Sequence, residues 1–195
     1  TAWVSAQNKV TFAFLDQIPF RKNIRERLEK LWNFPKFSPP SQEGSYYYFY
    51  KNDGLQNQSV LYRQKDLQSE PEVFLDPNTL NKEGTSALGS TSFSKDGKYF
   101  AYGINEAGSD WQTIRIKNTE TNQDINDVLL WTKFTGMAWH GNGFYYSRYD
   151  APKGSEFSTA NEFHKVYYHT LNTPQSSDVS CLSKKIIRKD IYLPV

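Results

Sequence analysis

The feature that most constrains this chain is a block of strand-forming aromatic residues around a glycine turn, which returns at a regular interval. Residues 92–103 have the order strand, Asp-Gly turn and strand, and residues 137–146 repeat that order in weaker form. Phe93 and Trp139 occupy equivalent places in the two blocks and are 46 positions apart. A period of about 40 to 50 residues made of short strands is typical of the blades of a β-propeller.

Other short strands complete the repeat. The first group is expected at residues 46–50, 59–64 and 73–75, the second continues at 113–117 and 128–130, and the third continues at 165–169. Aromatic residues make up 16% of the chain, and such side chains suit a pleated, half-buried sheet. An ordinary β-sandwich with similar hairpins remains the alternative, because an Asp-Gly turn is common in any hairpin.

The first segment has a helical pattern instead. Ile24, Leu28, Leu31 and Trp32 follow the spacing i, i+4, i+7 and i+8, which places them on one face of a helix. Pro19 favours a break between this helix and an upstream apolar set formed by Trp3, Val4, Val10, Phe14 and Leu15. The helical pattern stops before a proline-containing stretch, so we expect a domain boundary near residue 34.

Charge and composition bear on the expected binding partners and on the cellular compartment of the protein. The net charge of +2 gives no reason to expect nucleic acid or an anionic membrane as a partner. No run of 18 apolar residues and no signal-like segment occurs in the sequence. Cys181 is the only cysteine, which favours a reducing compartment, and we expect a cytoplasmic protein. The sequence starts without Met, within an apparent helix, and is interpreted as a piece of a longer protein.

The sequence contains no recognisable catalytic, metal-binding or cofactor-binding motif. The pentad G-x-S-x-G of α/β-hydrolases is absent, as are H-E-x-x-H and C-x-x-C. None of the histidines, His140, His164 and His169, stands near a nucleophile-like Ser or Cys, and each is interpreted as a surface or strand residue. Taken alone, Phe134 is interpreted as blade core and residues 108–111 as a polar loop with a packed Trp.

Several of these blocks closely resemble the prolyl oligopeptidase family. The resemblance rests on residues 49–62, 73–78 and 93–103, and Gly108-Ser109-Asp110-Trp111, Lys133-Phe134 and Met137-Ala138-Trp139 continue in the family's order. It implies an α/β-hydrolase peptidase domain, built from both ends of the chain, with a seven-bladed propeller inserted between them. The expected fold is therefore mainly β: about three blades of an incomplete propeller, preceded by the helical N-terminal arm of the peptidase domain.

This resemblance also predicts a division of the chain. Residues 1–33 would form the arm and residues 34–179 the first blades, while residues 180–195 depart from the family and are expected to be a non-native or disordered tail. The family's catalytic Ser, Asp and His lie downstream, so no catalytic residue is expected in this chain.

The function implied by the resemblance is that of a serine-type endopeptidase. The whole enzyme would hydrolyse proline-containing oligopeptides after proline, and its propeller would restrict access to the active site. The present chain alone would be inactive and, with exposed blade edges, prone to aggregate or unstable. In the family, a Phe at the position of Phe134 lines an apolar subsite for the residue two before the substrate's proline. Thr135-Gly136 stands where relatives often have Ser-Cys, so the subsite would differ in shape.

Two other functions are compatible with parts of the sequence. One is a non-enzymatic interaction module of the kelch or WD-repeat kind, against which the helical arm and residues 54–58 argue. The other is an oligopeptidase of the same clan with a different specificity, such as a preference for basic residues.

Overall fold

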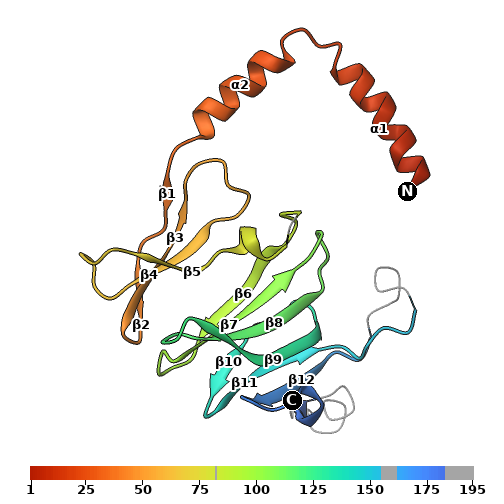
Figure 1. The fold of residues 1–195 in the computed structure, drawn as a ribbon. Helices are drawn as coiled ribbons and strands as arrows, with labels where there is room; N and C mark the ends of the chain where they lie inside the picture. The colour runs from red at the N-terminus through yellow and green to blue at the C-terminus, as the bar shows by residue number, and fades with distance from the viewer. Residues whose placement is uncertain (82, 155–161, 183–195) are drawn as a thin grey trace, which may run out of the picture.

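The computed structural model describes residues 1–81, 83–154 and 162–182, which form two helices followed by strands (Figure 1). The helices are α1 (Ala2–Leu15) and α2 (Arg21–Trp32). The strands are β1 (Lys36–Phe37), β2 (Ser41–Glu43), β3 (Tyr46–Asn52), β4 (Val60–Gln64), β5 (Glu72–Leu75), β6 (Ala87–Phe93), β7 (Tyr99–Asn105), β8 (Gln112–Asn118), β9 (Gln123–Thr132), β10 (Ala138–His140), β11 (Gly143–Arg148), β12 (Lys165–Thr170) and β13 (Val179–Leu182). Two short 3-10 helices, η1 (Pro77–Thr79) and η2 (Gln175–Ser177), lie in the connections.

Within the described residues, the strands pair as three consecutive antiparallel meanders of four strands each. The first blade is β2–β5, the second is β6–β9 and the third is β10–β13. Phe93 lies in β6 and Trp139 in β10, so both occupy the first strand of a blade, and the indole N–H of Trp139 donates to the carbonyl of Ser92 at 3.1 Å. The predicted mainly β fold with about three propeller blades is confirmed.

The second blade is buried on both of its faces because β7 alternates its side chains between its two neighbours. Phe100, Tyr102 and Ile104 pack against the first blade, where they meet Tyr48 and Phe74. Phe74 and Phe100 meet edge to face, with ring centroids 5.4 Å apart. Each such buried side chain stabilises the fold by about 1.5–3 kcal/mol.

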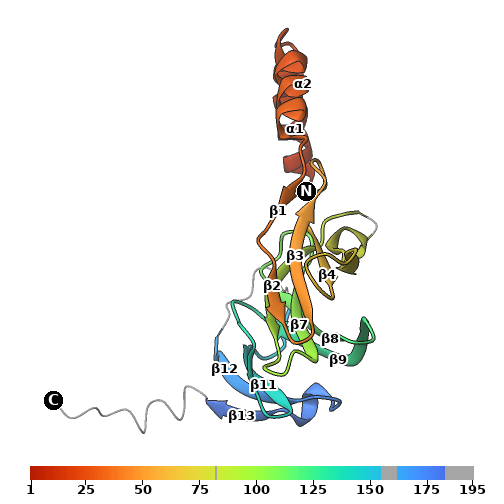
Figure 2. The ribbon, with the colours of Figure 1, turned by 90° about the vertical axis from the view of Figure 1, so that its left-hand side faces the viewer.

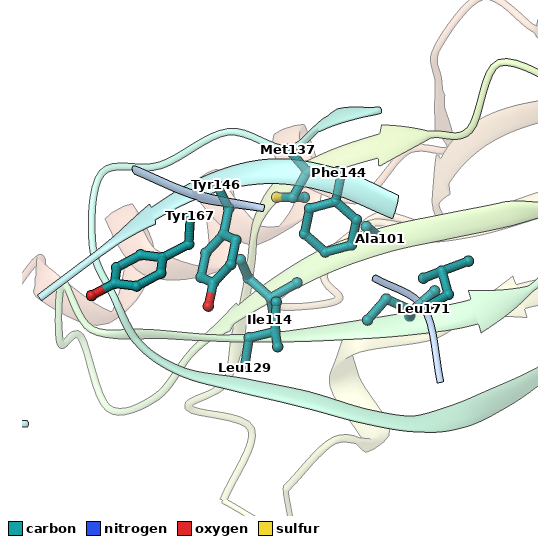
Figure 3. Packing of buried hydrophobic residues seen from close by; sticks show 9 residues of the cluster. Ala101, Ile114, Leu129, Met137, Phe144, Tyr146, Tyr167 and Leu171 are labelled. Atoms are coloured by element: carbon teal, nitrogen blue, oxygen red, sulfur yellow. The ribbon is translucent and has the colours of Figure 1, made fainter. Parts of the chain in front are cut away.

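The opposite face of the second blade packs on the third (Figure 3). Ala101 of β7 lies on this face, and its small side chain leaves room for Phe144 and Met137 of the third blade, which lie beside it in Figure 3. Ala101 and Phe144 are each 0% exposed. The rest of this cluster is Ile114, Ile116, Leu129, Tyr146, Tyr167 and Leu171.

The first and third blades are each covered on one face only. On the outer face of the first blade, Phe49 stacks on Tyr62 at 5.7 Å, and Val73 of the same face is 47% exposed. On the outer face of the third blade, Tyr145 packs on Tyr168 at 5.0 Å, and Val179 is 63% exposed. A sheet face carrying such residues ordinarily packs against another layer.

The helices stand away from the strands (Figures 1 and 2). They occur where the sequence predicts them, with the break between Leu15 and Arg21 at Pro19. No residue of either helix is buried, and Leu28, at the centre of the predicted apolar face, is 57% exposed. The apolar face therefore exists without a partner in the part of the chain that the structure describes. None of the described helices is long and apolar enough to span a membrane.

Some of the sequence-based boundaries were wrong. The short strands β1 and β2 were not predicted, and β9 has 10 residues where only 128–130 were expected. Residues 180–182, expected to begin a disordered or non-native tail, belong to β13, which pairs with β12. The rest of that expected tail, 183–195, lies outside the described residues.

The hairpin turns of the first two blades touch at Gly44 and Gly97, which gives a prediction. Gly97 has φ +68°, and a Cβ there would lie 2.4 Å from the Cα of Gly44. Gly97→Ala should therefore combine left-handed backbone strain with a backbone clash, and lower the free energy of unfolding by about 2–4 kcal/mol. A urea titration of the chain at micromolar concentration, followed by circular dichroism, measures this loss.

Gly108 supplies the matched control. Its φ is +73°, but a Cβ there would meet no atom within 4 Å. Gly108→Ala should show the backbone strain alone, about 1 kcal/mol. Equal losses for the two variants would contradict the close contact between the hairpins.

Candidate functional site

The end of β9 and the start of its connection to β10 carry two large aromatic residues with an unusual backbone. Trp131 has φ +62° and Phe134 has φ +52°. Non-glycine residues rarely adopt this left-handed region, and backbone strain of this kind clusters at functional sites. Residues 131–136 therefore form the candidate binding segment.

Three neighbouring strands hold this segment. The Thr132 hydroxyl donates to the carbonyl of Gln112 at 2.7 Å, and the hydroxyl of Thr135 accepts from the amide of Ser147 at 2.8 Å. The hydroxyl of Ser90 donates to the carbonyl of Thr135 at 2.7 Å. Thr132 and Thr135 are buried, so these bonds are shielded from water and fix the backbone on either side of Phe134.

Phe134 itself is presented to solvent. Its side chain is 73% exposed, so the interpretation as blade core, made from the residues alone, is wrong. An exposed aromatic ring on a fixed backbone can contact a ligand without the cost of ordering a loop.

Lys133 connects Phe134 with the loop between β7 and β8. Its Nζ lies 5.1 Å from the centroid of the Trp111 ring and 5.5 Å from that of the Phe134 ring. The same atom lies 3.7 Å from a carboxylate oxygen of Asp110. The polar loop predicted at residues 108–111 thus reaches the segment that carries Phe134.

A group of aromatic rings continues from this point. Trp111 meets Trp131 edge to face at 5.8 Å and Tyr149 at 5.9 Å. Tyr149 stacks on His164 at 4.4 Å, and burial lowers the pKa of that histidine. Trp111 and Trp131 also line a groove of about 380 Å³ together with Glu106 and Leu130. No sequence pattern predicts this grouping, because its members come from the β7–β8 loop, the end of β9 and the β11–β12 connection.

These loops lie at the end of the blades where the helices join. The amide of Ala107, in the β7–β8 loop, donates to the carbonyl of Thr85 at 3.2 Å, and the amide of Gln58, in the β3–β4 loop, donates to the side-chain oxygen of Asn78 at 2.9 Å. Thr85 and Asn78 both lie in the β5–β6 connection, which therefore joins the loops of the first two blades. Beside them, the Nζ of Lys36 donates to the carbonyls of Trp32 and Gly54, both at 2.9 Å. α2 therefore ends beside the β3–β4 loop of the first blade (Figure 1), and in the antiparallel order of the strands the β7–β8 and β9–β10 connections lie at the same end of the second blade.

His169 was interpreted as a surface or strand histidine, and it is a fully buried strand residue. Its Nδ1 lies 2.7 Å from Asp178 and its Nε2 lies 3.1 Å from Asp127, on β9 of the second blade. Tyr146 donates its hydroxyl to the other oxygen of Asp178 at 2.5 Å. Burial opposes the charged form of His169, but the hydrogen bonds to Asp178 and Asp127 outweigh it and raise the pKa of the imidazole.

This buried network joins two blades rather than forming a reaction centre. Both ring nitrogens of His169 are occupied by carboxylates, and Asp127 also accepts the amide N–H of Asn172 at 2.7 Å. His140, by contrast, ends β10 at the surface. Among the residues with assigned structure, no group of three or more His, Cys, Asp or Glu could hold a metal ion.

Comparison with known proteins gives a consistent result. The family model described as "Prolyl oligopeptidase, N-terminal beta-propeller domain" matches residues 1–189. A prolyl endopeptidase of Elizabethkingia miricola is 51% identical over 179 residues, which are 91% of this chain and 25% of the relative. Prolyl oligopeptidase A of Amanita bisporigera is 35% identical over 208 residues, covering 91% of this chain and 27% of that protein.

The fold has a matching solved structure. Prolyl oligopeptidase B from Galerina marginata, bound to a 25mer macrocyclization substrate, superposes with a TM-score of 0.85 at 29% identity. That match covers 95% of this chain and 29% of the other. The chain thus spans about a quarter of the length of the curated relatives it matches.

Proposed function

Because the chain belongs to the family of prolyl oligopeptidase N-terminal β-propeller domains, we propose that it forms the first quarter of a serine-type endopeptidase that cleaves short peptides after proline. In this proposal, residues 1–33 are an arm of the peptidase domain and residues 34–179 are the first blades of the propeller. The catalytic Ser, Asp and His come from outside the chain.

The single observation that carries the proposal is the placement of Phe134. Its ring is 73% exposed on a segment held by buried threonines, at the blade end where the helical arm joins. An arm that is part of a peptidase domain brings that domain to the same end of the blades. Phe134 then faces the peptidase domain and lines an apolar subsite for the residue two before the substrate's proline.

The exposed blade faces support a gating role for the completed propeller. Phe49 and Tyr62 on one side, and Tyr145 and Tyr168 on the other, form outer faces suited to further blades. A ring closed in this way covers the peptidase domain and excludes folded proteins while short peptides pass. Without those neighbours the two faces attract other copies, and the chain aggregates at high concentration.

The proposal predicts that this chain can supply the first quarter of an active enzyme. Residues 1–179 are substituted for the matching segment of the Elizabethkingia miricola prolyl endopeptidase, which gives a chimera called the graft below. The graft is expected to hydrolyse a blocked Ala-Pro reporter peptide with at least about a tenth of the parent's kcat/KM. A tenfold loss of kcat/KM corresponds to a loss of about 1.4 kcal/mol in transition-state stabilisation.

Three comparisons make this experiment decisive. The graft with its active-site serine replaced by alanine should be inactive, and so should the 195-residue chain alone. A reporter with Lys in place of Pro tests the alternative specificity and should be cleaved poorly. A folded graft without activity, or one that prefers the Lys peptide, would contradict the proposed function.

A further inference from the structure

Lys133 is a largely buried cation between two aromatic rings. Its side chain is 14% exposed, and its Nζ lies within 5.5 Å of the centroids of both the Trp111 and the Phe134 rings. A cation at this distance from an aromatic face is attracted by the ring's quadrupole, more strongly when it is removed from water. Lys133 thus joins an anchored ring to an exposed one.

Lys133 also forms an ion pair with Asp110, whose carboxylate is open to solvent. Asp110 is 59% exposed on its side chain, and the Nζ–Oδ2 distance is 3.7 Å, so water and salt screen the attraction. The ion pair and the two rings each offset part of the cost of burying the ammonium group.

Phe134 needs such an anchor because its ring has little packing of its own. With 73% of the side chain exposed, neighbouring atoms cover little of the ring and restrict its rotamers only weakly. Its backbone is fixed by the bonds of Thr132 and Thr135, but the side-chain torsions are not. The ring is therefore the part of the segment whose position depends on a side-chain contact.

We propose that Lys133 is a positioning residue that holds the Phe134 ring through the stack Trp111–Lys133–Phe134, and so sets the preference for an apolar residue two before the substrate's proline. The inference rests on the proposed function, since it concerns the subsite that Phe134 would line. It adds that the selectivity depends on a cation that itself does not touch the substrate.

The test uses the graft with two blocked reporter peptides, Phe-Ala-Pro and Gly-Ala-Pro, which differ only in the residue two before proline. Lys133→Met keeps the length and apolar stem of the side chain and removes its charge. We expect it to lower kcat/KM for the Phe peptide about fivefold, mainly through KM, and that for the Gly peptide less than about twofold. Lys133→Arg, which retains a cation that stacks on rings, should restore most of the preference.

Phe134→Ala shows whether the effect passes through that ring. It should remove the same preference, and adding Lys133→Met to it should cause no further loss, because two residues acting through one contact are not additive. The melting temperatures of all variants serve as the control for folding.

The outcomes separate the failure of this inference from the failure of the proposed function. If the graft is inactive, the proposed function fails and the inference with it. Another outcome is that Phe134→Ala lowers the preference for the Phe peptide while Lys133→Met leaves that preference unchanged, or lowers kcat/KM equally for both peptides. In that case the positioning role is wrong and the proposed function stands. If Phe134→Ala has no effect on the preference, the subsite and the role of Lys133 are both rejected.

Discussion

His169→Leu is expected to lower the free energy of unfolding by about 3–5 kcal/mol, as removal of one partner from a buried charge network does. The change leaves the buried carboxylates of Asp127 and Asp178 facing an apolar side chain, and it breaks the bond between β12 of the third blade and β9 of the second. Urea titration of the chain at micromolar concentration, followed by circular dichroism, measures the loss.

His140→Leu is the matched control for this prediction. His140 is exposed at the end of β10, and its backbone carbonyl, which accepts the hydroxyl of Tyr168, is unaffected by the substitution. Its effect should stay within about 0.5 kcal/mol. If His169→Leu costs no more than His140→Leu, the buried network does not join the two blades.

The same histidine predicts the direction of a pH dependence. Its pKa is raised above the ordinary value of 6.5 in the folded protein, because its bonds to Asp178 and Asp127 outweigh burial. The folded state therefore keeps the proton longer than the unfolded state, and the stabilisation is complete below about pH 6.5 and lost as pH rises through the folded pKa.

His169→Gln isolates this contribution. The difference in free energy of unfolding between the natural chain and this variant should be largest near pH 6 and decrease toward pH 8. The lowered pKa of His164 has the opposite sign, but it is common to both proteins and cancels in the difference. A difference that grows with pH would contradict a protonated His169.

The second large effect is expected at the contact between the second and third blades. Phe144 is 0% exposed and packs against Trp139 at 5.0 Å and His169 at 5.6 Å. Phe144→Ala removes a whole ring from this core and should cost about 3–5 kcal/mol, from lost burial and the cavity left behind. The measurement is again the urea midpoint of the chain.

Phe134→Ala is the same chemical change at an exposed site. With the ring 73% exposed, its effect on the free energy of unfolding should stay within about 0.5 kcal/mol. The pair compares a buried ring with an exposed one: the Phe144 ring stabilises the fold, and the Phe134 ring contributes little to stability. Similar costs for the two substitutions would mean that the Phe134 ring is packed in solution.

The blades were predictable because their signal is local. The alternation of aromatic residues and the Asp96-Gly97 turn fix strand and hairpin within a few neighbouring positions, and the return at Trp139 shows the repeat. The outermost strands of the blades were less predictable. β13 was missed because its sequence alternates poorly, and its pairing with β12 comes from tertiary contact.

The site was predictable only in part, because its contacts join residues that are distant in the sequence. Phe134 was suggested by family resemblance, but its left-handed backbone and exposure have no local sequence signal. Asp127 and His169 are separated by 42 positions, and Lys133 meets Trp111 from a different loop. The buried ion pair forms only when two blades stack, and the cation lies between rings only when the connections at one end of the second blade come together.

The central structural feature is a series of successive propeller blades, of which only the middle one has both neighbours in the part of the chain that the structure describes. Hydrogen exchange of the chain alone and of the graft tests this most directly, since exchange reports local opening of backbone hydrogen bonds. β7 should be protected in both, whereas β3, β4 and β12 should exchange faster than β7 in the chain alone and approach the protection of β7 in the graft. Equal protection of β3, β4, β7 and β12 in the chain alone, unchanged in the graft, would contradict it.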